Sequence, residues 1–145
     1  MIKLKFVTDI KSPKDKVWKV LWDDKTYRSW TSVFSEGSHA VSDWNEGSKV
    51  LFLSPEGDGM FSMIAKKTPN EYMSFKHLGV VKNGKEQTTD AEAEKWAGAM
   101  ENYTLKDSNG GTQLSVDIEV TEDFESYFRE TFPKALDKVK MLAEN

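Results

Sequence analysis

The last third of the chain constrains the fold more than any other segment. Residues 103–105 and 112–120 show strand patterns, and an Asn-Gly-Gly turn at 109–111 separates them. Residues 122–144 form an amphipathic stretch in which apolar side chains recur at intervals of three and four. That spacing is typical of a helix with one buried face. We therefore expect the chain to end in two strands followed by one long helix.

Pro133 lies inside this predicted helix. A proline removes a backbone donor and clashes with the preceding turn, so the sequence predicts a kink near residues 129–132. A kinked helix with large aromatic side chains before the kink suits a lid over a cavity. Alternatively, the kink only fits the helix to the curvature of a sheet.

Strand patterns dominate the rest of the chain. Residues 2–10 alternate apolar with charged side chains, at the period of a half-buried strand. Ser12 and Pro13 predict the start of a helix with Ser12 as its cap, and a second short helix carries Tyr27 and Trp30. A loop or short helical turn is expected at residues 86–95, and further strands at 39–44, 49–54, 60–68, 71–81, 96–106 and 112–120.

This order of elements predicts an α+β fold. One strand starts the chain, one helix ends it, and a run of strands lies between them. We expect a curved antiparallel sheet of about seven strands around a long C-terminal helix. A length of 145 residues favours a single domain spanning 1–145. The space between helix and sheet is a natural pocket for an apolar ligand.

Composition excludes several classes of function. The net charge of −4 argues against nucleic-acid binding, and the absence of cysteine excludes disulfides and thiolate sites. Two histidines without a tight cluster of carboxylates predict no metal site, and no cofactor is expected. No apolar run is long enough for a membrane span or a signal peptide, so the cytoplasm is the expected location.

A series of short motifs along the chain carries a family resemblance. They are Ser12-Pro13 with Val17-Trp18, then Trp30, Gly47, Pro69 with Tyr72 and Phe75, the run 96–105, Gly111-Thr112 with Leu114, and Phe132-Pro133-Lys134-Ala135-Leu136. This ordered set resembles the START-like superfamily, also called SRPBCC, and within it the homologues of the activator of heat-shock-protein ATPase. The resemblance implies the helix-grip fold. It also implies binding of a lipid, sterol, hormone or polyketide, or a cyclase or aromatase activity, as in other members.

Two polar residues fall on otherwise apolar strand faces. On the strand at 71–81, His77 shares a face with Met73, Phe75 and Gly79, and on the next strand Glu101 shares one with Ala99, Tyr103 and Leu105. Strands adjacent in the chain are expected to pair, which would bring the imidazole near the carboxylate. Such a pair could orient a ligand or relay a proton. Alternatively, Glu101 lies at a strand end in water and His77 is a satisfied wall residue.

Large aromatic and methionine side chains are the other candidates for the pocket. With 5 Trp, 8 Phe and 4 Tyr, the chain has enough rings to fill a core or line a cavity. The predicted ligand-binding set, including the polar pair, is Trp30, Phe34, Phe52, Phe61, Met63, Phe75, His77, Trp96, Glu101, Tyr103, Phe124, Phe128 and Phe132. No catalytic residue is assigned, since serine-nucleophile motifs are absent.

Three functions remain open. The first is a module that binds an apolar small molecule or a lipid-like ligand. The second is an enzyme of the cyclase, dehydratase or hydrolase type that uses His77, Glu101 or Tyr103. The third is an interaction protein that acts on a chaperone or forms a homodimer through exposed aromatics such as Trp22 or Trp44.

Overall fold

Eight strands form one antiparallel sheet in the computed structural model, which describes residues 1–145. The strand order is β1-β8-β7-β5-β4-β3-β2, with β6 paired to β5. The strands are β1 (Ile2–Ile10), β2 (His39–Val41), β3 (Lys49–Leu53), β4 (Gly59–Thr68), β5 (Tyr72–Lys82), β6 (Lys85–Gln87), β7 (Met100–Ser108) and β8 (Gly111–Val120). The helices are α1 (Lys14–Trp22), α2 (Asp24–Thr31), α3 (Ala91–Trp96) and α4 (Glu125–Glu144), with a short 3-10 turn at Glu122–Phe124.

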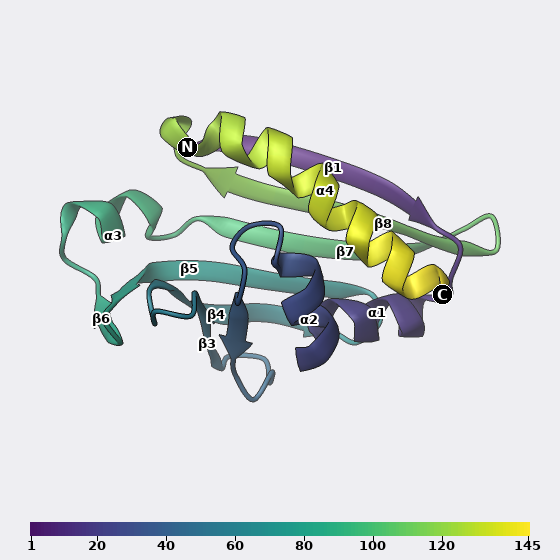
Figure 1. The fold of residues 1–145 in the computed structure, drawn as a ribbon, viewed down its shortest axis with the longest axis horizontal. Coiled ribbons are helices and arrows are strands. Elements are labelled where there is room, and N and C mark those ends of the chain that lie inside the picture. The colour runs from purple at the N-terminus through teal and green to yellow at the C-terminus, as the bar shows by residue number, and fades with distance from the viewer.

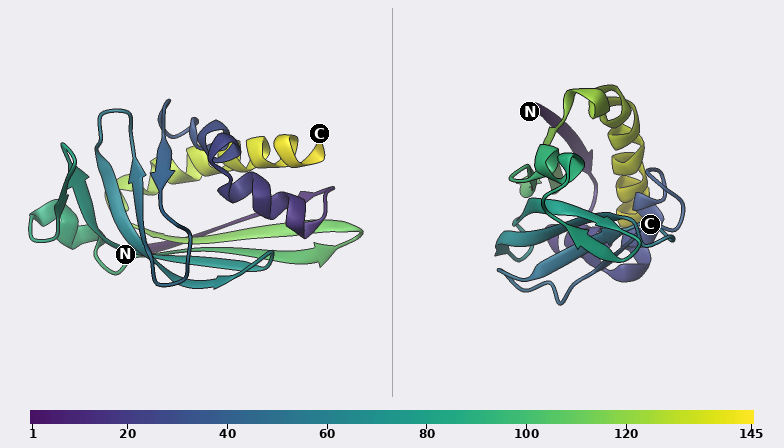
Figure 2. Two further views of the ribbon diagram at one scale, coloured as in Figure 1. Left: turned by 90° about the horizontal axis from the view of Figure 1, so that it is seen from below. Right: turned by 90° about the vertical axis from the view of Figure 1, so that its left-hand side faces the viewer.

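The helices α1, α2 and α4 lie on one side of the sheet (Figure 1). The left view of Figure 2 shows that strands β2, β3 and β4 turn up toward these helices, so the sheet is concave on the helical side. The long helix α4 runs across this concave face. The predicted α+β fold, a curved antiparallel sheet around a long C-terminal helix, is therefore confirmed.

The core lies between α4 and the concave face. On β8 every second side chain is buried, and on α4 the buried positions follow the helical period. Phe132 of α4 stacks on Phe6 of β1, with ring centroids 5.0 Å apart. A fully buried side chain of this size stabilises a fold by roughly 1.5–3 kcal/mol. The apolar stripe of α4 is therefore what holds the helix on the sheet.

Pro133 is accommodated within α4, which continues from Glu125 to Glu144. The proline lies on the exposed side of the helix, one residue after the buried Phe132. Its missing N–H therefore faces away from the core, where water can solvate the carbonyl left without a donor.

The start of α1 differs from the prediction. Pro13, not Ser12, occupies the cap position, and its carbonyl accepts the backbone N–H groups of Lys16 and Val17 at 3.1 Å. The Ser12 hydroxyl is buried without a hydrogen-bond partner. Ser12 lies one residue too early in the chain to reach the first turn of the helix.

The segment after β5 also differs from the prediction. Asp90 caps α3 by accepting the backbone N–H of Ala93 at 2.7 Å, so Trp96 ends a helix and does not begin a strand. Gly98 then takes a positive φ of 88°, and β7 begins at Met100. The cap and this glycine together move the start of the strand past Trp96.

A β-bulge at Leu78 changes which side chains of β5 face the concave side. Ser62 of β4 pairs with His77, but Phe61 pairs with Gly79, so Leu78 has no partner on β4. Residues directly opposite each other share a face, and the bulge therefore puts Gly79 and His77 on opposite faces. The predicted shared face of Met73, Phe75, His77 and Gly79 is wrong at Gly79 for this reason.

Candidate functional site

A cavity of about 320 Å³ lies between the concave face of the sheet, α2, the loop after α2 and α4. Its walls are mostly aromatic: Trp22, Tyr27, Trp30, Phe34, Phe52, Tyr127, Phe128 and Phe132. Ligand pockets in proteins commonly have volumes of about 300–1,000 Å³ and apolar walls with a few polar groups. The cavity is therefore large enough for a small organic molecule.

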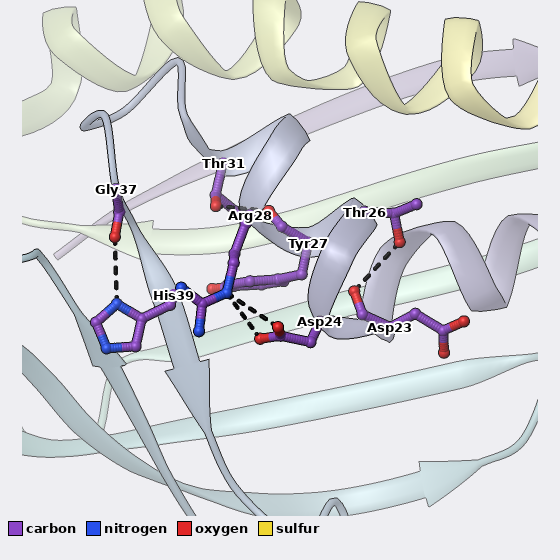
Figure 3. Close-up of polar contacts among 8 residues, drawn as sticks. All are labelled: Asp23, Asp24, Thr26, Tyr27, Arg28, Thr31, Gly37 and His39. Carbon is purple, nitrogen blue, oxygen red and sulfur yellow. Dashed lines mark hydrogen bonds and ion pairs between the residues drawn. The ribbon is translucent and has the colours of Figure 1, made fainter.

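Helix α2 places two rings at the cavity. Tyr27 and Trp30 are three residues apart, so they lie on the same face of the helix, and their rings meet edge to face at 5.4 Å. The Trp30 indole Nε1 donates to the Leu21 carbonyl at 3.1 Å, and the Thr31 hydroxyl donates to the Tyr27 carbonyl at 2.6 Å. Figure 3 shows the ring of Tyr27 reaching from α2 over the sheet. The first bond holds the Trp30 ring in place.

Helix α4 and the loop after α2 form the opposite wall. Phe128 and Phe132 are one turn apart on α4, and Phe34 of the loop packs against them with ring centroids at 6.1 and 5.2 Å. The Tyr127 hydroxyl donates to the Phe34 carbonyl at 2.9 Å, which ties the loop to the helix. The wall is therefore built from segments about 95 residues apart in the chain, which no local pattern brings together.

The sheet side of the cavity carries a chain of polar side chains. The His77 Nδ1 lies 2.6 Å from the Ser62 Oγ, and the His77 Nε2 lies 3.2 Å from the Glu101 Oε1. The Tyr103 hydroxyl donates to the other carboxylate oxygen of Glu101. Strands β5 and β7 are paired, as predicted, with Phe75 opposite Glu101. The expected approach of His77 to Glu101 is therefore confirmed, and Ser62 and Tyr103 extend the chain at both ends.

Two buried phenols face this carboxylate. Burial and the negative charge of Glu101 both raise the pKa of Tyr27 above its ordinary value. The pKa of Tyr103 is raised well above its ordinary value, first by burial, then by the charge of Glu101 and by its hydrogen bond to that carboxylate. Both hydroxyls therefore keep their protons at neutral pH. The Tyr103 hydroxyl donates its hydrogen bond to Glu101, whereas the Tyr27 hydroxyl makes no hydrogen bond within the protein.

The less buried end of the cavity is also polar. Its half-buried or exposed polar lining residues are Ser35, Ser38, His39, Ser54 and Asp58. The His39 Nδ1 faces the Gly37 carbonyl at 3.2 Å (Figure 3). No lysine or arginine lines the cavity, although two of its lining residues, Asp58 and Glu101, are acidic.

Most of the residues predicted for the pocket line the cavity. They are Trp30, Phe34, Phe52, His77, Glu101, Tyr103, Phe128 and Phe132. Phe75 instead lies behind the wall, fully buried, with its ring 5.2 Å from that of Phe52 and 5.3 Å from that of Trp22.

Four predicted residues lie elsewhere. Phe61 pairs with Gly79, and Met63 pairs with the exposed Lys76, so both are on the face of the sheet away from the helices. Trp96 and Phe124 pack against each other at 5.6 Å and line a groove beside the cavity, which shares Met60, Tyr127 and Phe128 with it. Phe61 and Met63 were predicted from residue type alone, and residue type does not show which face of a strand a side chain occupies.

Several lining residues were not predicted, above all Trp22, Tyr27 and Met60. Tyr27 precedes Trp30 by three residues, so helical spacing already put it on the same face. Met60 and Ser62 are two residues apart on β4, so they share the concave face. This spacing would have identified Met60 once the orientation of β4 was known. Trp22, at the end of α1, carries no such signal.

No family model matches this chain, and no curated protein sequence matches it. Solved structures do match. The Aha1 dimer of Colwellia psychrerythraea superposes with a TM-score of 0.75 at 18% identity, over 99% of this chain and 97% of that one. Protein CV1439 of Chromobacterium violaceum gives 0.71 at 16%, over 99% and 98%. CalU16 of Micromonospora echinospora gives 0.69 at 14%, over 97% and 75%.

The chain has the helix-grip fold. At these identities the likeness concerns architecture alone, and one fold can host different activities. The cavity of this chain lies between the sheet and the long helix. No helix here is long and apolar enough to cross a membrane. No group of three or more His, Cys, Asp or Glu side chains is placed to hold a metal ion.

Proposed function

We propose that this protein binds an apolar small molecule in the cavity between the sheet and α4. The observation that carries the proposal is the aromatic cavity of about 320 Å³ with a small set of polar groups at one side. An apolar ligand gains free energy in proportion to the area that it buries, and polar groups orient it. The walls of the cavity come from α1, α2, α4 and the five strands β2, β3, β4, β5 and β7, so they are positioned by the whole fold.

Binding is tested with the neutral apolar dye Nile red and the purified protein. The wild-type protein should bind the dye saturably with a blue-shifted emission. Phe128→Ala removes a ring from the wall and should weaken binding roughly tenfold, because a partly buried phenylalanine ring contributes on the order of 1.4 kcal/mol. Met141→Ala serves as the matched control, because Met141 lies on the same helix but is 55% exposed and remote from the cavity. Equal binding by wild type and Phe128→Ala contradicts the proposal.

Native mass spectrometry of the protein as purified adds a direct measurement. A ligand that co-purifies and is lost in Phe128→Ala supports the proposal and supplies the mass of the molecule. We also propose a cytoplasmic location and a single domain over residues 1–145. Cell fractionation tests the location, and a single unfolding transition tests the domain organisation.

A hydrolase mechanism has less support from the geometry. Ser62, His77 and Glu101 form an unbroken hydrogen-bonded chain of the kind that activates a serine nucleophile. Ser62, however, is fully buried and does not line the cavity. A substrate in the cavity therefore has no access to the Ser62 hydroxyl, and the serine acts on His77 by holding its ring.

A dimer through exposed tryptophans also has less support. Trp22 is buried, and Trp44 packs on Trp22 and Phe75 with ring centroids at 5.6 and 6.3 Å. The prediction that both rings are exposed is therefore wrong for Trp22, whereas Trp44 is half-buried. The similar protein from Colwellia psychrerythraea is a dimer, and sedimentation of this protein would show whether it associates through another face.

A further inference from the structure

The charge of the cavity lining selects among apolar ligands. Glu101 and Asp58 line the cavity, and no lysine or arginine does. Two cationic side chains of α2 and α4 have partners outside the cavity: Arg28 pairs with Asp24 at 3.0 Å (Figure 3), and the Lys138 Nζ donates to the Ser29 carbonyl at 3.2 Å. A carboxylate or phosphate head group would therefore meet the carboxylates of the lining with no lysine or arginine to offset them.

Glu101 keeps acceptor capacity that points into the cavity. A carboxylate offers about four lone-pair sites, and the protein uses one on each oxygen, for His77 and for Tyr103. The Glu101 side chain is 24% exposed, and the residue lines the cavity. When His77 carries its proton on Nε2, it donates to Glu101 while Nδ1 accepts from Ser62.

The Tyr27 hydroxyl supplies a second polar contact. Tyr27 is 8% exposed, lines the cavity and makes no hydrogen bond within the protein. The Tyr27 oxygen is not among the fully buried atoms that lack a partner, so water or a ligand in the cavity can reach it. Glu101 acts on this hydroxyl electrostatically, because its charge is one of the two causes that raise the pKa of Tyr27. The unused acceptors of Glu101 and the unpartnered phenol therefore belong to the same region of the cavity.

The aromatic rings near Glu101 suit a positive charge. The Trp30 ring lies 6.4 Å from that of Tyr103, and the Phe52 ring lies 6.4 Å from that of Tyr27 and 6.2 Å from that of His77. The faces of aromatic rings attract cations, and the effect strengthens where water is excluded. An ammonium group at Glu101 would thus be met by one carboxylate, one free hydroxyl and surrounding rings.

We propose that the ligand of this cavity is an alkylammonium compound with an aromatic or other apolar body. The ammonium group donates to Glu101 and to the oxygen of Tyr27, and the body lies among the rings of Trp30, Phe52 and Phe128. This inference rests on the proposed function, since it names the class of molecule that the same cavity binds.

Three probes with one ring system and different head groups test the proposal. They are the ammonium compound 2-(1-naphthyl)ethylamine, the alcohol 2-(1-naphthyl)ethanol and the carboxylate 1-naphthaleneacetate. Calorimetry at neutral pH should rank the ammonium compound about tenfold above the alcohol, since a hydrogen bond to a charged group is stronger than a neutral one. The carboxylate should show no saturable binding. An equal affinity for ammonium compound and alcohol, or a preference for the carboxylate, overturns the proposal.

Two substitutions localise the effect. Glu101→Gln keeps the shape and one acceptor but removes the charge, so it should lower the affinity for the ammonium compound about tenfold and change that for the alcohol less than about twofold. Asp137→Asn removes an exposed carboxylate of α4 that does not line the cavity, and it should change both affinities by less than about twofold. An unaltered preference in Glu101→Gln overturns the assignment to this carboxylate. If that variant does not fold, the ranking of the three probes on the wild-type protein still decides.

The two proposals fail in different ways. If none of the naphthyl probes binds but Nile red does, the cavity binds apolar ligands and the ammonium inference is wrong. If Nile red also fails to bind, the proposed function itself is wrong.

Discussion

Two tyrosines of the cavity are both buried but differ in the partners of their hydroxyl groups. Tyr103 is 1% exposed and donates to Glu101, whereas Tyr27 is 8% exposed and has no partner within the protein. Substituting each by phenylalanine removes one oxygen and leaves the ring in place. The two variants therefore compare a satisfied buried hydroxyl with an unsatisfied one in the same site.

The magnitudes follow from these contacts. A hydrogen bond to a charged group contributes about 1.5–3 kcal/mol to stability. Because the Glu101 side chain is 24% exposed, water replaces part of the lost bond, and Tyr103→Phe should lower the free energy of unfolding by about 2 kcal/mol. The Tyr27 hydroxyl makes no bond to the protein and its oxygen is not fully buried, so Tyr27→Phe should leave this free energy unchanged to within about 0.5 kcal/mol.

Urea denaturation followed by tryptophan fluorescence measures the difference. The slope of the transition should stay constant, so the midpoints report stability directly. The melting temperatures of the two variants should differ by roughly 4–8 °C, since about 1 kcal/mol shifts a domain of this size by about 2–4 °C. Tyr127→Phe is the control: its hydroxyl bonds the Phe34 carbonyl at the surface and should contribute about 0.5–1 kcal/mol. If Tyr27→Phe destabilises the protein as much as Tyr103→Phe, the Tyr27 hydroxyl is already satisfied and the argument for a free polar group in the cavity fails.

Three further expectations follow from the same contacts. Because the pKa values of Tyr27 and Tyr103 are raised in the folded protein, both phenols ionise more readily in the unfolded chain. The free energy of unfolding should therefore fall as the pH rises above about 10; urea midpoints should fall from pH 9 to pH 11, and less so in the double Tyr→Phe variant. In Gly79→Ala the new Cβ would lie 2.3 Å from the backbone oxygen of Gln87, so the free energy of unfolding should drop by more than about 2 kcal/mol. An unchanged free energy would contradict the described backbone geometry at Gly79. Phe132→Ala, at a 3% exposed core position, should reduce the free energy of unfolding by about 3–5 kcal/mol. Phe128→Ala should reduce this free energy much less while weakening dye binding. Equal losses of free energy in the two variants would show that Phe128 is core and not cavity wall.

Strand registers explain why part of the site was predictable. Glu101, Tyr103 and Leu105 share a face, as alternation predicts, and they pair with Ile118, Val116 and Leu114 of β8. The same alternation failed after His77, because the bulge at Leu78 inserts one residue and reverses the face of every later position. A bulge depends on how two strands pair, which a single strand's pattern does not contain.

Local chemistry also predicted elements better than it predicted their ends. The Asp90 cap begins helix α3, and this helix ends at Trp96. A tryptophan that looked like the start of a strand therefore lies with Phe124 in the groove beside the cavity. Caps and glycine conformations decide such boundaries, and they compete with patterns that fit either structure.

The sequence by itself determined the order of the strands and helices, the amphipathic nature of the last helix and the antiparallel character of the sheet. These features follow from side-chain periods of two and 3.6, which are local properties of the backbone. Only the tertiary structure decided which face of β4 is concave, that Tyr27 has no partner, and that the cavity carries carboxylates without a lysine or arginine. Those properties depend on distances between segments far apart in the chain, and such distances arise when the sheet curves around α4 and closes the space between them.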